Sequence, residues 1–202
     1  NDVRKFCGLD DIPDNSQITR FKQNFVSELE NLFNHLVDVT EPICYKIDPE
    51  LASYISFDTS GIEPYVTENN PKFLNSIIKK LKHIYKDKPK TDIYKMAYGL
   101  MPSCAFANNQ VKQLYINGYF CYAYKFAIIT NGLGIPRNIT FLDDDFKVKH
   151  PEIQIDKKTD SPDEDKSISD SKALKPVLTD YFNIHPNIKH HTFLGDSIFD
   201  TY

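Results

Sequence analysis

Two stretches of the chain place apolar residues at the spacing of an amphipathic α-helix. Between residues 16 and 38 these positions share one face of a repeat of about 3.6 residues: Ile18, Phe21, Phe25, Leu29, Leu32 and Leu36. Ser16 is a favourable N-cap, and Thr40-Glu41-Pro42 predicts the end of this helix because proline lacks a backbone donor. A second helix is predicted to begin at Asn70-Pro71, with an apolar face made of Phe73, Leu74, Ile77, Ile78, Leu81 and Ile84.

Other segments have the composition of β-strands. Residues 51–58 predict one strand, and residues 115–142 predict a β-region whose first part, residues 119–129, is rich in aromatic and β-branched side chains. Asn131-Gly132 is a typical turn pair, and residues 137–142 form the expected return strand. Residues 143–168 are charged and predict a surface loop. A helix is then expected over residues 170–182, opened by Ser169 or Asp170, followed by a short strand at residues 190–194.

The composition limits the range of interpretations. The chain has 202 residues, of which 41% are hydrophobic, and this is enough for one ordinary core with a small appendage. Its formal net charge of −4 does not by itself indicate nucleic-acid binding, so such a function requires a local basic surface. The four cysteines form no CxxC pair, which argues against a zinc site and favours reduced thiols in the cytosol. The sequence contains no signal peptide and no long apolar span.

Two aspartates are the main candidates for chemistry. Asp58 ends the strand predicted at residues 51–58, just past its apolar run, and Asp196 follows the strand predicted at residues 190–194. A carboxylate at the end of a buried strand is held firmly yet faces an open cleft, and two such groups side by side suit Mg²⁺, which takes oxygen ligands. The alternative interpretation is that each aspartate is a turn or cap residue, the commonest role of aspartate after a strand.

A basic segment lies within this acidic chain. Residues 72–95 contain eight lysines and only two aspartates, and Lys79, Lys80 and Lys82 lie together on the second predicted helix. Such a helix face can neutralise phosphates of nucleic acid. It is equally compatible with the solvated face of an ordinary amphipathic helix.

Two further groups look like metal ligands but favour other interpretations. Three adjacent carboxylates, Asp143-Asp144-Asp145, repel one another and rarely all face one ion, so we interpret them as part of a solvated loop. His190 and His191 are neighbours in a predicted strand and would point to opposite faces, so they are not expected to share a metal.

Four motifs resemble the DDE transposases of bacterial insertion sequences, which have a ribonuclease H-like catalytic domain. The motifs are Asp58-Thr59-Ser60-Gly61-Ile62-Glu63, the Gly118-Tyr119 to Lys125 segment with Gly134-Ile135-Pro136, Asp170-Ser171-Lys172-Ala173-Leu174, and Gly195-Asp196-Ser197-Ile198-Phe199-Asp200. Each is weak alone, but the four occur in the family's order from about residue 50 onward. The resemblance implies an α/β fold, namely a ribonuclease H-like mixed sheet with flanking helices, incomplete at its C-terminus. The expected division is an N-terminal helical region, residues 1–46, and a partial catalytic domain, residues 47–202, with a helical insertion at about residues 68–110.

The resemblance also implies a function for the two aspartates. Asp58 and Asp196 would be catalytic and would bind Mg²⁺ or Mn²⁺, and Lys79, Lys80 and Lys82 would contact DNA. The substrates would be the ends of the element and then target DNA. The partner would be a second copy of the chain. The protein would act in the bacterial cytoplasm, at the nucleoid, with no membrane involved. The family's third carboxylate, a glutamate after the second aspartate, has no counterpart, so we expect this chain alone to be inactive as an enzyme.

Two alternatives remain open from the sequence. The chain is either part of a longer transposase, as its first residue Asn1 and its end at Tyr202 lead us to expect, or a non-enzymatic remnant that binds DNA or inhibits intact transposase. A different metal nuclease on the same fold would need a third carboxylate within these residues, and Glu63 is the nearest candidate.

Overall fold

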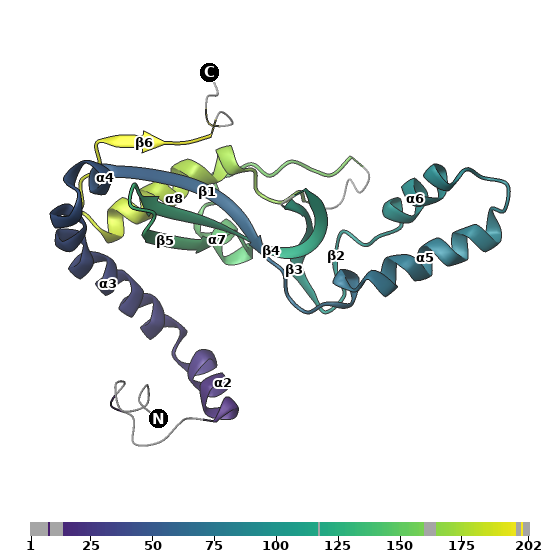
Figure 1. The fold of residues 1–202 in the computed structure, drawn as a ribbon, viewed down its shortest axis with the longest axis horizontal. Coiled ribbons are helices and arrows are strands. Elements are labelled where there is room, and N and C mark those ends of the chain that lie inside the picture. Colours follow the sequence, from purple (N-terminus) through teal and green to yellow (C-terminus); the bar gives the residue numbers. More distant parts are fainter. Residues whose placement is uncertain (1–7, 9–13, 117, 160–164, 197–198, 200–202) are drawn as a thin grey trace.

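The computed structural model describes residue 8, residues 14–116, 118–159 and 165–196, and residue 199. The fold is mixed α/β, with helices flanking a mixed sheet (Figure 1). In chain order, the elements are α2 (Asn15–Asn24), α3 (Val26–Ile47), α4 (Pro49–Ser53), β1 (Tyr54–Ile62), η1 (Thr67–Asn69), α5 (Pro71–Ile84), α6 (Lys90–Gly99), β2 (Cys104–Ala105), β3 (Asn108–Ile116), β4 (Tyr119–Asn131), β5 (Pro136–Phe141), α7 (Asp144–Lys149), α8 (Asp170–Ile184) and β6 (Thr192–Leu194).

The sheet is organised around the long strand β4. Strands β1, β3 and β5 each pair with β4 in antiparallel orientation, whereas β6 pairs with β1 in parallel orientation. The strand order is β2-β3-β4-β1-β6, with β5 also pairing with β4. Helix α8 precedes β6 in the chain and provides the crossover that a parallel pair requires.

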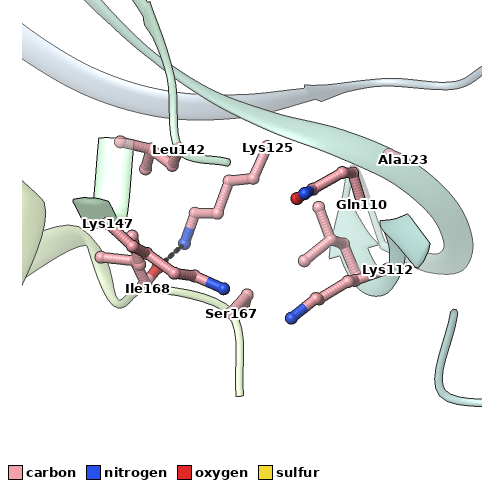
Figure 2. A pocket seen from close by; sticks show the side chains of 9 residues that line it. Gln110, Lys112, Ala123, Lys125, Leu142, Lys147, Ser167 and Ile168 are labelled. Carbon is pink, nitrogen blue, oxygen red and sulfur yellow. Dashed lines mark hydrogen bonds between the residues drawn. The ribbon is translucent and has the colours of Figure 1, made fainter. Parts of the chain in front are cut away.

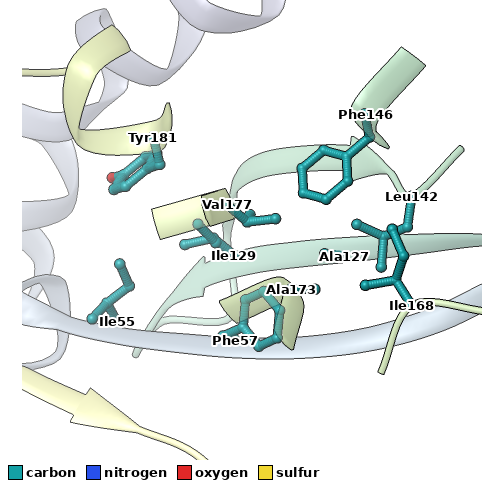
Figure 3. Packing of buried hydrophobic residues seen from close by; sticks show 10 residues of the cluster. All are labelled: Ile55, Phe57, Ala127, Ile129, Leu142, Phe146, Ile168, Ala173, Val177 and Tyr181. Atoms are coloured by element: carbon teal, nitrogen blue, oxygen red, sulfur yellow. The ribbon is translucent and has the colours of Figure 1, made fainter. Parts of the chain in front are cut away.

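Helices α7 and α8 cover one face of this sheet (Figure 3). Ile55 and Phe57 of β1 and Ala127 and Ile129 of β4 alternate with residues that point away from the core, as strand geometry dictates. The helices and the adjoining loops contribute the remaining buried side chains: Leu142, Phe146, Ile168, Ala173, Val177 and Tyr181. The face of β1 that bears Ile55 and Phe57 is therefore its core face.

The N-terminal helix prediction is correct in its existence but wrong at both ends. Asp14, not Ser16, is the N-cap, because Asp14 and Gln17 form a reciprocal capping box. The helix breaks at Phe25, and α3 then continues to Ile47 with Pro42 in its interior. Of the predicted region at residues 1–46, residues 1–7 and 9–13 lie outside the described residues.

Contacts with Arg137 explain why α3 extends past Pro42. The guanidinium of Arg137, a fully buried residue of β5, donates hydrogen bonds to the Val37 carbonyl at 3.2 Å and the Thr40 hydroxyl at 2.9 Å. It also donates to Cys44 Sγ and lies 3.1 Å from Glu41 Oε2. These contacts fall on both sides of the proline, so tertiary packing outweighs the lost helix hydrogen bond.

Three other boundaries differ from the sequence prediction. Residues 51–53 belong to α4, whose first turn is capped by Asp48, and β1 begins only at Tyr54. Strand β3 begins at Asn108, seven residues before the predicted β-region. Helix α7 lies within the segment predicted as a loop because Asp143 caps it by accepting from the Phe146 N–H at 3.0 Å.

The turn and helix α5 agree with the sequence prediction, whereas α6 was not predicted as a separate helix. Asn131 Oδ1 accepts from the backbone N–H groups of Leu133 and Ile135, and Gly134 has a φ of 76°, a conformation that favours glycine. Helices α5 and α6 pack through a small core of Ile78, Leu81, Ile93 and Ala97 and extend away from the sheet (Figure 1). None of the described helices is long and apolar enough to cross a membrane.

Candidate functional site

Asp58 lies within β1 rather than beyond its end. The predicted strand stops at residue 58, but pairing with β4 continues to Ile62, so Asp58 stands opposite Ile128. Because side chains alternate along a strand, Asp58 faces away from the core side occupied by Phe57. The Asp58 side chain is exposed, and its Oδ1 accepts a hydrogen bond from the Thr59 N–H at 2.7 Å.

The pairing of β1 with β6 brings together the two segments that carry the aspartates. Tyr54 is paired with Thr192, and Ser56 with Leu194, where β6 ends two residues before Asp196. If the same parallel register continued for two more residues, Asp196 would stand level with Asp58. The two aspartates, 138 positions apart in sequence, thus belong to segments that meet in the fold, and the proximity of their carboxylates stays a prediction.

A third carboxylate does not join this pair within the described residues. No group of three histidine, cysteine, aspartate or glutamate side chains arranged to hold a metal occurs there. Glu63 follows the end of β1, roughly 16 Å along the strand from Asp58, which is too far for both to ligate one ion. Its carboxylate instead accepts a hydrogen bond from the Tyr119 hydroxyl. Of the last motif, Ser197, Ile198 and Asp200 lie outside the described residues.

A polar cluster links β1, β4 and α8 on the core side of the sheet. Asp170 Oδ1 accepts hydrogen bonds from Lys125 Nζ and from the Thr59 hydroxyl, both at 2.7 Å. Lys125 Nζ also donates to the Ile168 carbonyl at 2.6 Å. Burial acts to raise the pKa of Asp170, but the hydrogen bonds from Lys125 and Thr59 and the Lys125 charge lower it below its usual value.

Sequence reasoning treated Asp170 mainly as a helix cap and gave Lys125 no role. Asp170 is in fact the first residue of α8, Ser169 occupies the N-cap position, and the Asp170 carboxylate cross-links three elements of the fold. The only sequence signal was that Thr59, Lys125 and Asp170 each lie within one of the family-like motifs.

We expect Asp170→Asn to lower the free energy of unfolding by about 1–3 kcal/mol, because it leaves the partly buried Lys125 ammonium without its anionic partner. A carboxylate with a lowered pKa in the folded state stabilises the fold above its unfolded pKa of about 3.9. This contribution should disappear as the pH falls from that value through the lower folded pKa. Urea unfolding of the wild type and Asp170→Asn from pH 7 to pH 2.5 measures this contribution, with the exposed Asp145→Asn as control. If the free energy of unfolding depends on pH in the same way in both variants, Asp170 has no stabilising role.

A hollow beside this cluster is lined by three lysines (Figure 2). Lys112 of β3, Lys125 of β4 and Lys147 of α7 border a cavity of about 20 Å³, roughly the space of one water molecule. Lys125 and Lys147 are paired with Asp170 and Asp144, whereas Lys112 forms no ion pair with any described residue. Burial lowers the pKa of Lys112, and the nearby Lys147 charge lowers it further. Sequence reasoning missed this convergence because the three lysines come from separate elements.

The basic segment lies on the helical hairpin. Lys79, Lys80 and Lys82 are all exposed on α5, and Lys82 Nζ lies 5.9 Å from the centre of the Tyr94 ring. None of the three forms an ion pair with a described residue, so their charges face solvent. The hairpin that presents them extends away from the sheet (Figure 1).

The remaining candidate ligands have structural partners. Asp143 caps α7, and Asp144 is bound to Lys147 at 2.8 Å and to Gln110. His190 contacts the Tyr181 hydroxyl through Nε2 at 2.9 Å, and burial lowers the pKa of His190. His191 is exposed, so the two histidines lie in different environments.

Comparison of the chain with protein-family models, with curated proteins and with solved structures finds no match to any of them. The arguments for function therefore come from the residues and their arrangement.

Proposed function

We propose that Asp58 and Asp196 are two metal ligands of a DDE-type centre that cleaves and joins DNA strands. The observation that supports this most strongly is the parallel pairing of β1 with β6, which brings together the segments that carry the two aspartates. Both aspartates are exposed, and extending the register two residues past Leu194 would set Asp196 level with Asp58, as two ligands of one ion require.

The order of the strands also supports the proposal. The ribonuclease H-like core implied by the resemblance has three antiparallel strands, then a helix, then a strand parallel to the first. Strands β1, β4 and β5 with α8 and β6 follow the same sequence of pairings. The short strand β2, strand β3 and the α5–α6 hairpin are inserted between β1 and β4.

In this proposal two carboxylates, Asp58 on β1 and Asp196 just after β6, would hold a divalent cation. Mg²⁺ or Mn²⁺ at such a site would supply Lewis-acid stabilisation of a phosphodiester oxygen and would lower the pKa of bound water. Asp58 is oriented by the hydrogen bond from the Thr59 N–H, and the next side chain, Thr59, is tied to Asp170 on the opposite face. Two carboxylates leave most of the coordination of Mg²⁺ to water and substrate oxygens, as that ion prefers.

DNA is the proposed partner, and the exposed lysines of α5 are the proposed contact surface. The alternative function, a non-enzymatic chain that binds DNA or pairs with intact transposase, uses the same lysines but not the aspartates. The chain's affinity for a duplex with an exposed end, measured by fluorescence anisotropy with and without Mn²⁺, separates the two. The metal-centre proposal predicts a rise of at least about fivefold with Mn²⁺, whereas metal-independent binding supports the alternative and absence of binding contradicts both.

The triple substitution of Lys79, Lys80 and Lys82 with glutamine should weaken DNA binding at low salt by at least tenfold and reduce the salt slope by about two to three. The loss should be uniform across sequences because phosphate contacts do not read bases. The matched control replaces Lys149, Lys157 and Lys172, which are already paired with aspartates. If both triple variants lose affinity equally, α5 is not a specific contact surface and only net charge matters.

A further inference from the structure

A row of large apolar side chains is exposed along α2 and α3. The row, here called the apolar stripe, consists of Ile18, Phe21, Phe25, Val26, Leu29, Leu32, Leu36, Val39, Ile43 and Ile47. Their exposed fractions run from 36% for Leu29 to 65% for Ile47, and α2 has no buried residue. The sequence places six of these residues on one helix face, and in the folded chain all six are exposed to solvent.

The orientation of α3 fixes the direction in which the stripe faces. The other side of the helix is held against the body of the protein by Val37, Glu41 and Cys44, all of which contact Arg137. Asp38 accepts from His185, the C-cap residue of α8, at 2.7 Å, which anchors the same side. Rotating the stripe inward would therefore break a buried polar network, so its exposure is a built feature of the fold.

The stripe has the area of an interface. The exposed fractions correspond to on the order of 900 Å² per chain, compared with about 800 Å² per partner in a standard stable complex. The largest apolar patch on a typical monomer is about 300–600 Å². Its length is also suitable, because Phe25 to Ile43 spans roughly 27 Å of helix.

The spacing within α3 is that of a helix–helix seam. Leu29, Leu32, Leu36, Val39 and Ile43 follow one another at alternating intervals of three and four residues, the heptad pattern of coiled-coil core positions. The pattern is also self-complementary. In an antiparallel pair centred on Asn34, each core residue meets another across the two-fold axis, in the pairs Leu32–Leu36, Leu29–Val39, Phe25–Ile43 and Phe21–Ile47.

We propose that the apolar stripe is the interface for a second copy of this chain, bound antiparallel so that Leu32 of one copy packs on Leu36 of the other. This interaction surface is independent of the metal site and of DNA binding.

The shape of the molecule favours the antiparallel arrangement. Helix α2 and the first half of α3 project away from the sheet, so antiparallel pairing places the two bodies at opposite ends of the helix pair (Figure 1).

Sedimentation velocity of the wild-type chain and two double variants tests the proposal. We expect the wild type to be a dimer at micromolar concentration. Leu32→Lys with Leu36→Lys puts like charges in both central layers and should raise the dissociation constant at least 100-fold, giving a monomer. Leu32→Glu with Leu36→Lys places Glu opposite Lys only in the antiparallel register. Its dissociation constant should therefore be at least tenfold lower than that of the double lysine variant.

The control is Ile84→Lys, which replaces an exposed apolar residue of α5 and should leave the dimer intact. Far-ultraviolet circular dichroism and urea unfolding verify that each variant is folded, since the substituted side chains face solvent. A monomeric wild type, or a dimer that survives the double lysine variant, overturns the proposal. Equal dissociation constants for the two double variants would overturn the antiparallel register. None of these readouts depends on metal or DNA, so this inference fails separately from the proposed function.

Discussion

Replacement of Arg137 with methionine is expected to lower the free energy of unfolding by about 3–5 kcal/mol. The Arg137 side chain is completely buried, and its guanidinium holds together four residues of α3. Burial raises the pKa of Glu41, and the charges of Arg137 and His185 offset this rise only in part. Neither Glu41 oxygen accepts a hydrogen bond from a described residue. Removing the arginine therefore leaves a buried acid with little compensation.

Urea unfolding at matched protein concentration measures this change, because association would shift the apparent stability. The exposed Arg20→Met is the matched control and should stay within about 0.5 kcal/mol of the wild type. The double variant Arg137→Met with Glu41→Leu should regain at least half of the loss, since an apolar pair of similar volume can replace a buried ion pair. If the Arg137→Met change is below about 1 kcal/mol, the network does not hold α3 to the sheet.

Asp58→Asn and Asp196→Asn are each expected to lower the affinity for Mn²⁺ at least tenfold, because each removes one of two charged oxygen ligands. The double variant should lose little more than either single variant, since two residues that share one ion are strongly coupled. The free energy of unfolding without metal should change by less than about 0.5 kcal/mol, because Asp58 is exposed. Electron paramagnetic resonance of free Mn²⁺ measures the affinities.

Asp145→Asn is the matched control for these variants, since Asp145 is an exposed carboxylate on α7 with the same charge. It should bind Mn²⁺ like the wild type. Additive losses in the double variant would mean that Asp58 and Asp196 bind separate ions, which contradicts a shared site.

The sequence predicted the elements whose stability is local and missed those that depend on distant contacts. The apolar spacing and Asn70-Pro71 correctly predicted α5, which begins at Pro71, and Ser169 and Asp170 correctly located the start of α8. The break at Phe25 and the passage of α3 through Pro42 were not predicted. The continuation of α3 through Pro42 follows from contacts with Arg137, which lies about a hundred residues away in sequence.

The candidate site shows the same division. The apolar runs before Asp58 and Asp196 located both aspartates near neighbouring strands, but the sequence could not show that β1 continues past Asp58, because that depends on pairing with β4. The Thr59–Lys125–Asp170 cluster and the lysine-lined hollow join three elements each, and no local pattern records such contacts. The polar partners of Asp143, Asp144 and His190 likewise became evident only from the fold.

The most direct test of the metal site is to locate Mn²⁺ on the chain by paramagnetic broadening in a ¹H–¹⁵N spectrum. A shared site predicts that substoichiometric Mn²⁺ broadens the amide signals of residues 57–59 and 194–196 together, and that Asp58→Asn abolishes both effects. Two results would contradict the claim that Asp58 and Asp196 bind one ion. The first is broadening confined to Asp143–Asp145. The second is broadening around Asp196 that stays unchanged in the Asp58→Asn variant.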